Sequence, residues 1–339
     1  MIAEVSAGTA SDLYIDAALV MSSGYERPSP SRGAERADGL RLLYAGAVNG
    51  LVGDPETGKT LIATAIAAEG IARGESVLWI DVDHNGPAAT LARLGRFGVQ
   101  ESVLLDTNRF RLAIPDEQSA VLGLVADAER WHPDLVIVDS MGEILPMFGA
   151  STNSADEFTN VNMRTLARLA KSGAAVLALD HMAKGAESRQ MGAAGTFAKK
   201  RAVDGAYLRV SSKGFKPGEG GLASLSILKD RHGSLRAQSP SGQEPEFTTF
   251  ILEEAEGEVS WRFIVPDAAN GAPDMGALLG DLRSMDPQPR NYREVEAKLR
   301  IADKLARDLW RTHRAMLEEA EHLPAAAPAP AAPAAPERT

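Results

Sequence analysis

The 339-residue sequence contains no cysteine. Disulfide bridges, thiolate nucleophiles and metal sites with cysteine ligands are therefore excluded. The sequence also has no apolar run near the roughly 18 residues that a membrane-spanning helix needs. Its first residues include Glu4, Asp12 and Asp16, and no basic stretch precedes the short apolar segment 17–21. This start is unlike a secretory signal, so we expect a cytoplasmic protein with no membrane partner.

Basic residues are fewer than acidic ones. The chain has 36 Lys and Arg against 46 Asp and Glu, a formal net charge of −10. A chain of this charge does not attract nucleic acid as a whole and would have to use local basic patches. Apolar residues make up 44% of the chain, which suffices for a sizeable core and excludes disorder throughout.

Short apolar runs alternate with helical patterns along the first two thirds of the chain. Strands are expected at 47–52, 77–81, 135–139 and 174–179, and helices at 59–73, 87–97, 117–131 and 155–171. This alternation predicts an α/β fold, a mostly parallel sheet with helices on both faces. Further strand-like runs without long helices, at 206–211, 222–228, 247–252 and 259–264, predict antiparallel strands that extend the sheet.

Composition divides the chain into five parts. Turn-rich residues without periodicity mark a flexible N-terminal arm, and the Ala/Pro repeat at the end cannot pack a core. The predicted parts are an arm (1–38), an α/β domain (39–265), a linker (266–286), a helical segment (287–322) and a disordered tail (323–339).

One segment matches the phosphate-loop pattern G-x-x-x-x-G-K-[ST]. It reads Gly53-Asp54-Pro55-Glu56-Thr57-Gly58-Lys59-Thr60, with an apolar run before it and a helical pattern after it. In this context backbone N–H groups curl round phosphates, Lys59 reaches the β and γ oxygens, and Thr60 can ligate Mg²⁺. The segment predicts a site for ATP with Mg²⁺.

A carboxylate follows the loop at the distance that such a site needs. The apolar run 135–138 ends in Asp139, which suits contact with Mg²⁺. Ser140 could orient the metal or a water molecule. The alternatives are an ordinary strand-end aspartate that caps the next turn and a small polar residue with no role.

Taken in order, five segments resemble the RecA-like ATPases, in particular the bacterial and bacteriophage group related to RepA-type hexameric helicases and often described as AAA-family ATPases. The similarity covers about residues 40–240. The segments are 53–60, 79–86, 136–140, 177–184 and 229–233. The resemblance implies a RecA-like ATPase that assembles into a homo-oligomeric ring. It also implies that the ATPase acts on DNA in replication or recombination, as a helicase or a helicase-like motor.

The resemblance also implies roles for single residues. Asp83 stands where the family usually has a glutamate that polarises the attacking water, and Asp81 could share that role. Asp83 or Asn85 could instead cap the helix that begins at Pro87. His181 stands where the family has a polar residue that senses the γ-phosphate, although a structurally satisfied histidine is the alternative.

Two basic residues near 230 correspond to a trans finger. In the resembling family such a pair comes from the neighbouring subunit and stabilises charge in the transition state. Lys229 and Arg231 are two apart on a strand, so they can point together at one phosphate. A solvated strand face is the alternative.

Two regions could bind nucleic acid. A glycine-rich loop carries Lys184, Arg189, Lys199, Lys200 and Arg201 against the single Glu187. These residues could track the phosphates of single-stranded DNA, or they could be ordinary surface charge. Segment 291–311 resembles a helix-turn-helix with a core of Val295, Leu299, Ile301, Leu305 and Leu309. A helix pair that docks on protein is the alternative.

Two other functions fit a phosphate loop. A nucleotide-gated regulatory or adaptor protein would bind ATP and a protein partner without moving along DNA, and the acidic charge and Asp83 favour it. A small-molecule kinase is disfavoured because the sequence shows no lid-like arginine cluster.

Overall fold

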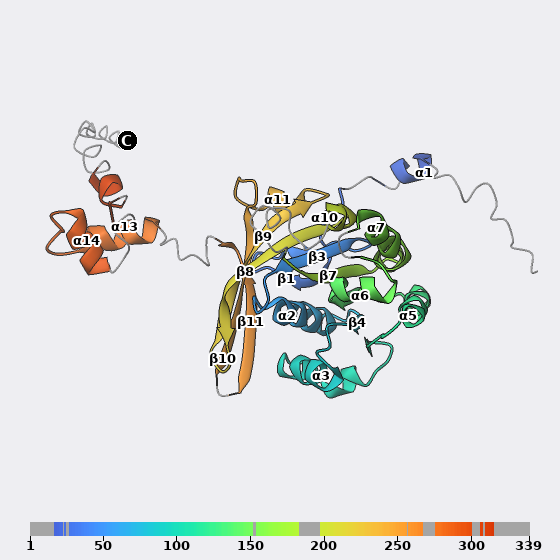
Figure 1. The fold of residues 1–339 in the computed structure, drawn as a ribbon. Coiled ribbons are helices and arrows are strands. Elements are labelled where there is room, and N and C mark those ends of the chain that lie inside the picture. Colours follow the sequence, from blue (N-terminus) through green and yellow to red (C-terminus); the bar gives the residue numbers. More distant parts are fainter. Residues whose placement is uncertain are drawn as a thin grey trace, which may run out of the picture. The chain divides into compact units, whose positions relative to one another are not determined.

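The computed structural model describes residues 17–22, 24, 27–151, 154–182, 197–255, 257–266, 275–299, 306–307 and 309–314. The chain divides into two compact units, residues 1–269 and 270–339. Figure 1 shows a central sheet in the first unit and a group of short helices in the second. Among the described residues, no helix is both long and apolar enough to cross a membrane.

The first unit is built on a sheet that has nine strands among the described residues, in the order β11-β10-β9-β8-β3-β7-β6-β4-β5. The bounds are β3 Val48–Gly53, β4 Val77–Asp81, β5 Phe110–Ala113, β6 Leu135–Asp139, β7 Ala175–His181, β8 Ala206–Lys216, β9 Gly220–Asp230, β10 Glu246–Ala255 and β11 Glu258–Ile264. Strands β3 to β8 pair in parallel, and β9 to β11 continue the sheet in antiparallel pairing. The predicted α/β fold is confirmed, although the short edge strand β5 was not predicted.

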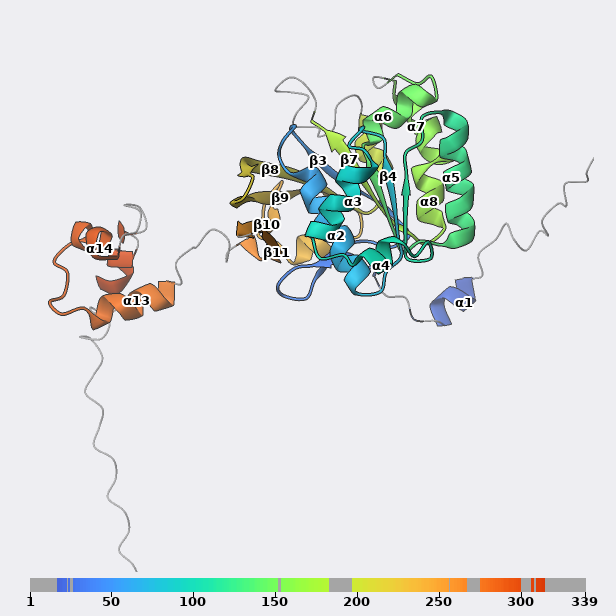
Figure 2. The ribbon, with the colours of Figure 1, turned by 90° about the horizontal axis from the view of Figure 1, so that it is seen from below.

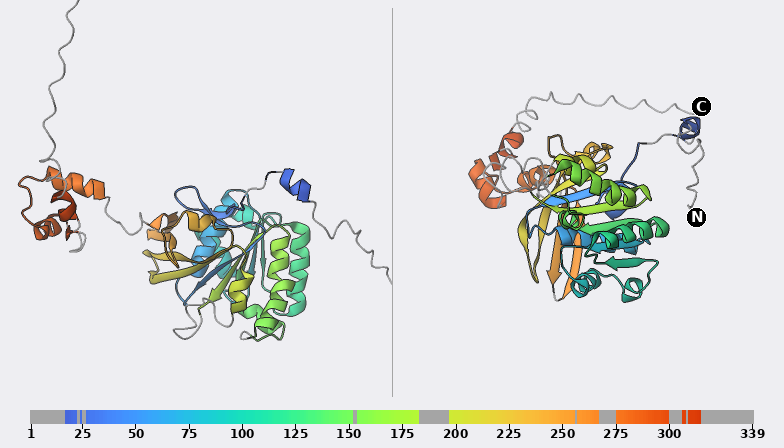
Figure 3. Two further views of the ribbon diagram at one scale, coloured as in Figure 1. Left: turned by 90° about the horizontal axis from the view of Figure 1, so that it is seen from above. Right: turned by 45° about the vertical axis from the view of Figure 1, so that its right-hand side comes forward.

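Helices cover both faces of the sheet (Figure 2 and Figure 3). The parallel strands are buried on both sides, so alternate residues of β6 enter different cores: Ile137 packs on the side of α2, and Val138 on the side of α5. The helices of this unit are α1 Ala17–Ser22, α2 Lys59–Ala72, α3 Pro87–Arg96, α4 Glu101–Leu104, α5 Gln118–Trp131, α6 Met141–Met147, α7 Ala155–Arg164, α8 Leu166–Lys171, α10 Phe197–Ala202 and α11 Ser234–Ala237.

One predicted helix is two helices. The pattern over 155–171 predicts a single helix, but the structure breaks it between α7 and α8 at Thr165, which has φ −125° and ψ −95°. The buried Thr165 hydroxyl donates to the carbonyl of Val161 at 2.8 Å. A threonine that bonds back to its own helix competes with the regular backbone ladder, which accounts for the bend.

The folded body begins before Gly39. Strands β1 (Arg32–Glu35) and β2 (Arg41–Leu43) pair as a small sheet against α2, so the predicted arm is too long at its C-terminal end. Gly33 has φ +71°, and a Cβ there would lie 2.8 Å from the side chain of Ile66 on α2. The close approach of β1 to α2 therefore requires glycine.

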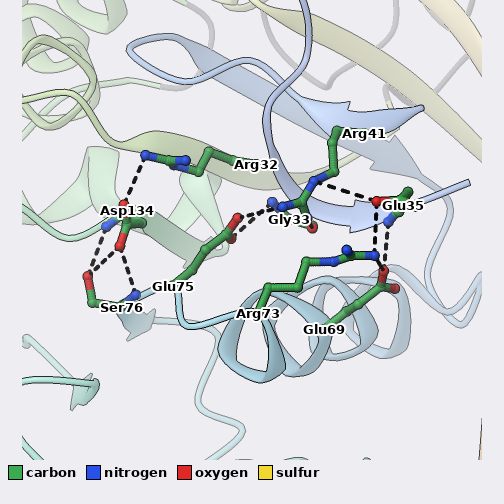
Figure 4. Close-up of polar contacts among 9 residues, drawn as sticks. All are labelled: Arg32, Gly33, Glu35, Arg41, Glu69, Arg73, Glu75, Ser76 and Asp134. Atoms are coloured by element: carbon green, nitrogen blue, oxygen red, sulfur yellow. Dashed lines mark hydrogen bonds and ion pairs between the residues drawn. The ribbon is translucent and has the colours of Figure 1, made fainter. Parts of the chain in front are cut away.

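Charged contacts fasten β1 to the rest of the unit (Figure 4). The buried carboxylate of Glu75 accepts the Gly33 N–H at 3.1 Å, and burial raises its pKa. Arg32 pairs with Asp134 at 3.0 Å. Arg73 pairs with Glu69 at 2.7 Å and Glu35 at 3.0 Å. These contacts lie at the amino end of β4. They are therefore structural and lie away from the carboxyl ends of the strands.

The second unit contains α13 (Met275–Ser284) and α14 (Tyr292–Leu299), with further helical residues at 309–314. Among its described residues, a small core contains Leu279, Leu282, Val295, Ala306 and Leu309. The predicted linker 266–286 therefore ends too late, because α13 occupies 275–284. Val295 and Leu309 are buried as the helix-turn-helix pattern predicts and Leu299 packs against them, whereas Ile301 and Leu305 lie outside the described residues.

Alanine substitutions at Gly33 and Gly39 should differ in cost. Both residues have a positive φ, but nothing lies within 4 Å of a Cβ at Gly39. We expect Gly39→Ala to cost about 1 kcal/mol from backbone strain alone and Gly33→Ala to cost about 1–3 kcal/mol more from overpacking against Ile66. Urea unfolding of both variants measures the difference, and equal losses would contradict the packing of β1 on α2.

Candidate active site

The phosphate loop joins β3 to α2 and has the curled backbone that anion binding requires. Glu56 (φ +63°) and Gly58 (φ +87°) are both in left-handed conformations. Alternation of left-handed and right-handed residues turns successive N–H groups into one concavity. The Thr57 hydroxyl donates to the carbonyl of Asp54 at 2.7 Å and holds the loop closed. The loop therefore presents amide donors at the N-terminus of α2.

A second reason for glycine at position 58 is the close approach of Phe215, a contact that the sequence did not predict. A Cβ at Gly58 would lie 2.2 Å from the ring of Phe215 on β8. Phe215 thus packs directly on the loop and lines the adjoining cleft.

The cleft lies beside the loop, where the carboxyl ends of β3, β4, β6 and β7 meet, as ligand crevices do in open α/β sheets. Its volume is about 470 Å³. Its lining residues are Pro55, Glu56, Gly58, Lys59, Thr60, Leu61, Asp83, Asn85, Arg93, Asp139, Ser140, His181 and Phe215. The loop and the residues predicted from three separate strand ends are thus brought together.

Lys59 of the phosphate loop is buried. The residue is 8% exposed, and its Nζ donates to the carbonyls of Gly53 (3.0 Å) and Asp54 (2.9 Å). Burial lowers its pKa, while the charges of Asp139 and other carboxylates oppose this shift. The lysine is therefore held in place by the loop itself.

Asp139 is a buried carboxylate at the predicted metal position. It is 3% exposed, its Oδ2 accepts the Thr60 hydroxyl at 3.0 Å, and the Asn85 amide donates to the same oxygen at 3.3 Å. Burial raises the pKa of Asp139 to about 6, and the nearby charges of Asp83 and Asp81 add to the shift. Thr60 and Asp139 thus adjoin as the metal prediction requires.

The loop after β4 separates the roles of its two aspartates. Asp81 is fully buried, and its oxygens accept the Gly86 N–H (2.9 Å) and the Asn85 side chain (3.1 Å). It therefore positions the loop and does not face the cleft. Asp83 is exposed and lines the cleft. The N-cap of α3 is Gly86 without a side-chain bond, so the alternative that Asp83 or Asn85 caps this helix is wrong.

Three buried polar atoms on the cleft walls have no hydrogen-bond partner within the described part of the chain. They are the Ser140 hydroxyl, His181 Nδ1 and Arg93 Nη1. Buried polar groups are normally paired, and an unpaired one is explained by a missing ligand, ion or water molecule. His181 ends β7 beside Gly53 of the loop in the sheet register, so a group bound by the loop lies within its neighbourhood.

Residues 29–187 match the family model of an AAA domain. This segment is thus similar to P-loop ATPase domains of AAA type, a class that generally binds ATP with Mg²⁺. The match includes the loop, Asp83, Asp139 and His181, and it does not single out the RepA-type group. No curated protein matches the chain.

Lys229, predicted to contact phosphate, is engaged elsewhere. Its Nζ donates to the carbonyls of Lys200 (3.0 Å), Arg201 (3.1 Å) and Val203 at the end of α10. An ammonium has three N–H donors, so Lys229 is saturated as a helix C-terminal partner. The prediction that it points with Arg231 at a phosphate is corrected.

Arg231 is exposed and lies outside the cleft of its own chain. The preceding Asp230 pairs with Ala206 at the start of β8, and β8 runs parallel to β3. Arg231 therefore lies near the amino ends of the parallel strands, whereas the phosphate loop lies at their carboxyl ends.

Lys199 is not available to DNA, contrary to prediction. Its Nζ lies 2.6 Å from Asp180 Oδ2, and its side chain is 2% exposed. The other Asp180 oxygen accepts the N–H of His181 at 2.8 Å. Arg201 is exposed and Lys200 is half-buried. Lys184 and Arg189 lie outside the described residues.

Asp139→Asn should stabilise the nucleotide-free protein at neutral pH. A folded-state pKa of about 6 exceeds the unfolded value of about 3.9. Folding therefore loses stability as pH rises from about 4 to 6, and the loss persists above 6. We expect a gain of about 1–3 kcal/mol at pH 7.5 that shrinks towards pH 4.5. Urea unfolding at both pH values measures it. A loss at pH 7.5, or the same gain at both, would contradict the buried charge.

Proposed function

We propose that this protein is a Mg²⁺-dependent ATP hydrolase that works as an oligomer on DNA, a helicase-like motor in replication or recombination. The observation that carries the hydrolase is the convergence of the phosphate loop with buried unpaired polar atoms of Ser140, His181 and Arg93 in one cleft. Three structural elements contribute these atoms, and a ligand rich in oxygen acceptors would satisfy the hydroxyl and the arginine.

The residues present fit a nucleotide with its metal. The loop amides and Lys59 suit the phosphates, and the adjoining Thr60 and Asp139 suit Mg²⁺. The described residues contain no group of three His, Asp or Glu side chains placed to hold a metal alone, so the phosphates would share the coordination. When bound, Mg²⁺ neutralises charge on the β and γ oxygens.

Asp83 has the exposure that a residue acting on water needs. It lines the cleft, while Asp81 is committed to its loop and Asp139 to Thr60 and Asn85. Asp83 would orient water and accept its proton. Its side chain is one methylene shorter than the glutamate usual in the resembling family, so slow turnover is expected.

The position of Arg231 supports an oligomer. An exposed arginine at the end of the sheet opposite the loop could reach a nucleotide of a neighbouring subunit. Such a finger is worth roughly 10³–10⁵ in rate in other ATP and GTP hydrolases. A ring or filament of subunits would bring Arg231 of one subunit to the phosphate loop of the next.

A basic helix joined to the cleft supports action on DNA. The ion pair of Lys199 with Asp180 ties α10 to the strand end that carries His181. Lys200 and Arg201 follow on the same helix. A change at His181 would thus reach residues able to contact phosphates of a single strand.

A nucleotide-gated adaptor is the second candidate. Two of the basic residues predicted to contact phosphates, Lys199 and Lys229, are consumed by internal contacts. That reduces the basic surface on a chain of net charge −10.

Single-stranded DNA should separate the two functions. For a motor we expect ATP hydrolysis to rise about tenfold or more with a single-stranded oligonucleotide, and light scattering to report an oligomer. The stimulation should fall in Lys200→Ala/Arg201→Ala and persist in Arg262→Ala, an arginine paired with Glu253 on β11. Hydrolysis that is indifferent to DNA in an intact oligomer would favour the adaptor.

Mixing two inactive variants tests the arginine in trans. Lys59→Ala should lose hydrolysis by orders of magnitude, because it removes a cation of the loop. Arg231→Ala should bind ATP normally and hydrolyse it very slowly. In a mixture, an intact Arg231 from a Lys59→Ala subunit can serve its neighbour, so some activity should return. No recovery in proven mixed oligomers would place Arg231 outside the reaction.

A further inference from the structure

Arg93 is a cleft residue that the sequence motifs did not include. It lies on α3, on the face whose Thr90 and Leu94 are buried against the body. A basic residue on the buried face of a helix is the signal that could have found it. Its side chain reaches the cleft together with Lys59, Thr60 and Asp139.

The Arg93 side chain is half-buried, and one nitrogen of its guanidinium is buried without a partner. Nη1 is buried without a hydrogen bond, and no ion pair joins Arg93 to a carboxylate among the described residues. Burial lowers the pKa of Arg93, and the charges of Asp139 and Asp81 oppose that shift from a distance. Leaving a buried guanidinium N–H without a partner is unfavourable, and an anion bound in the cleft would supply that partner to the half-buried Arg93.

Arg96 on the same helix shows the ordinary alternative. Its side chain is 56% exposed and pairs with Glu254. The two arginines are three residues apart, yet only Arg93 lines the cleft. The two side chains share one helix, so their environments differ because of where each side chain lies and not because of the composition of the helix.

The two cations of the cleft come from different walls. Lys59 belongs to the loop at the end of β3 and is anchored to loop carbonyls. Arg93 comes from the helix that follows β4, beside Asp139 and Asp83. An anion bound by the loop and extending towards the carboxylates would pass beside Arg93.

We propose that Arg93 binds the terminal phosphate of a nucleoside triphosphate in its own chain, so that the cleft distinguishes triphosphate from diphosphate before any neighbour contributes. This inference rests on the proposed hydrolase. In hydrolysis the water oxygen bonds to the γ-phosphorus, the bond to the β–γ bridging oxygen breaks, and the water proton leaves through Asp83 or solvent. Arg93 keeps its protons throughout and neutralises the charge of the transferred group.

The test compares nucleotide affinities in Arg93→Gln, Arg93→Lys and the control Arg96→Gln. Fluorescent ADP and a fluorescent non-hydrolysable ATP analogue are titrated with Mg²⁺, and thermal unfolding is followed without nucleotide. A lost charge-assisted bond predicts about 10- to 100-fold weaker binding of the triphosphate in Arg93→Gln, with ADP changed less than about threefold. Arg93→Lys should recover part of the loss, and Arg96→Gln should behave as wild type.

Other outcomes overturn the inference. If Arg93→Gln weakens both nucleotides equally, or unfolds at lower temperature with the nucleotide preference unchanged, Arg93 serves as a counter-charge for Asp81 and Asp139. If the wild type binds neither nucleotide, the proposed hydrolase fails and this inference fails with it. Wild-type binding with an unaltered preference in the variant overturns only the role of Arg93.

Discussion

The cleft depends on one buried carboxylate, Asp139, at the end of strand β6. It is held by the Thr60 hydroxyl from the phosphate loop and the Asn85 amide from the loop after β4. Two further aspartates lie near enough to raise its pKa. Several negative charges at a site that is largely shielded from solvent destabilise the protein without ligand and favour the binding of a cation. The scaffold tolerates this cost because β6 is buried on both faces and cannot easily rearrange.

The basic residues discussed above fall into two groups. Some have partners within the protein, and others keep polar atoms without a hydrogen-bond partner. Lys199 neutralises Asp180, and Lys229 caps α10. Lys199 has a direct counter-ion, and the three N–H donors of Lys229 all have carbonyl partners. Arg93 and His181 retain buried atoms without partners. Within the cleft, buried polar atoms without partners therefore mark the groups that a ligand could satisfy.

The sequence predicted what depends on local pattern. Apolar runs located the parallel strands because those strands are buried on both faces, and the phosphate loop was found because its glycines and Lys59 have fixed spacing. Contacts between distant segments were not predicted. Nothing near Arg32 indicates that β1 packs on α2 through Gly33, and Asn85 reaches Asp139 only after folding. Lys199 and Lys229 were misjudged because their partners, Asp180 and the end of α10, cannot be identified from spacing alone.

Hydrogen exchange with and without a Mg²⁺-bound ATP analogue tests most directly that the loop and the ends of β4 and β6 form one ligand site. We expect slower exchange in three places: the loop 53–60, the segment 81–86 and residues 139–142. The β1–β2 sheet on the scaffold side should not change. Slower exchange of this kind requires that the ligand meets the loop and the carboxylates together. No change at 81–86 and 139–142, with protection only elsewhere, would contradict the site.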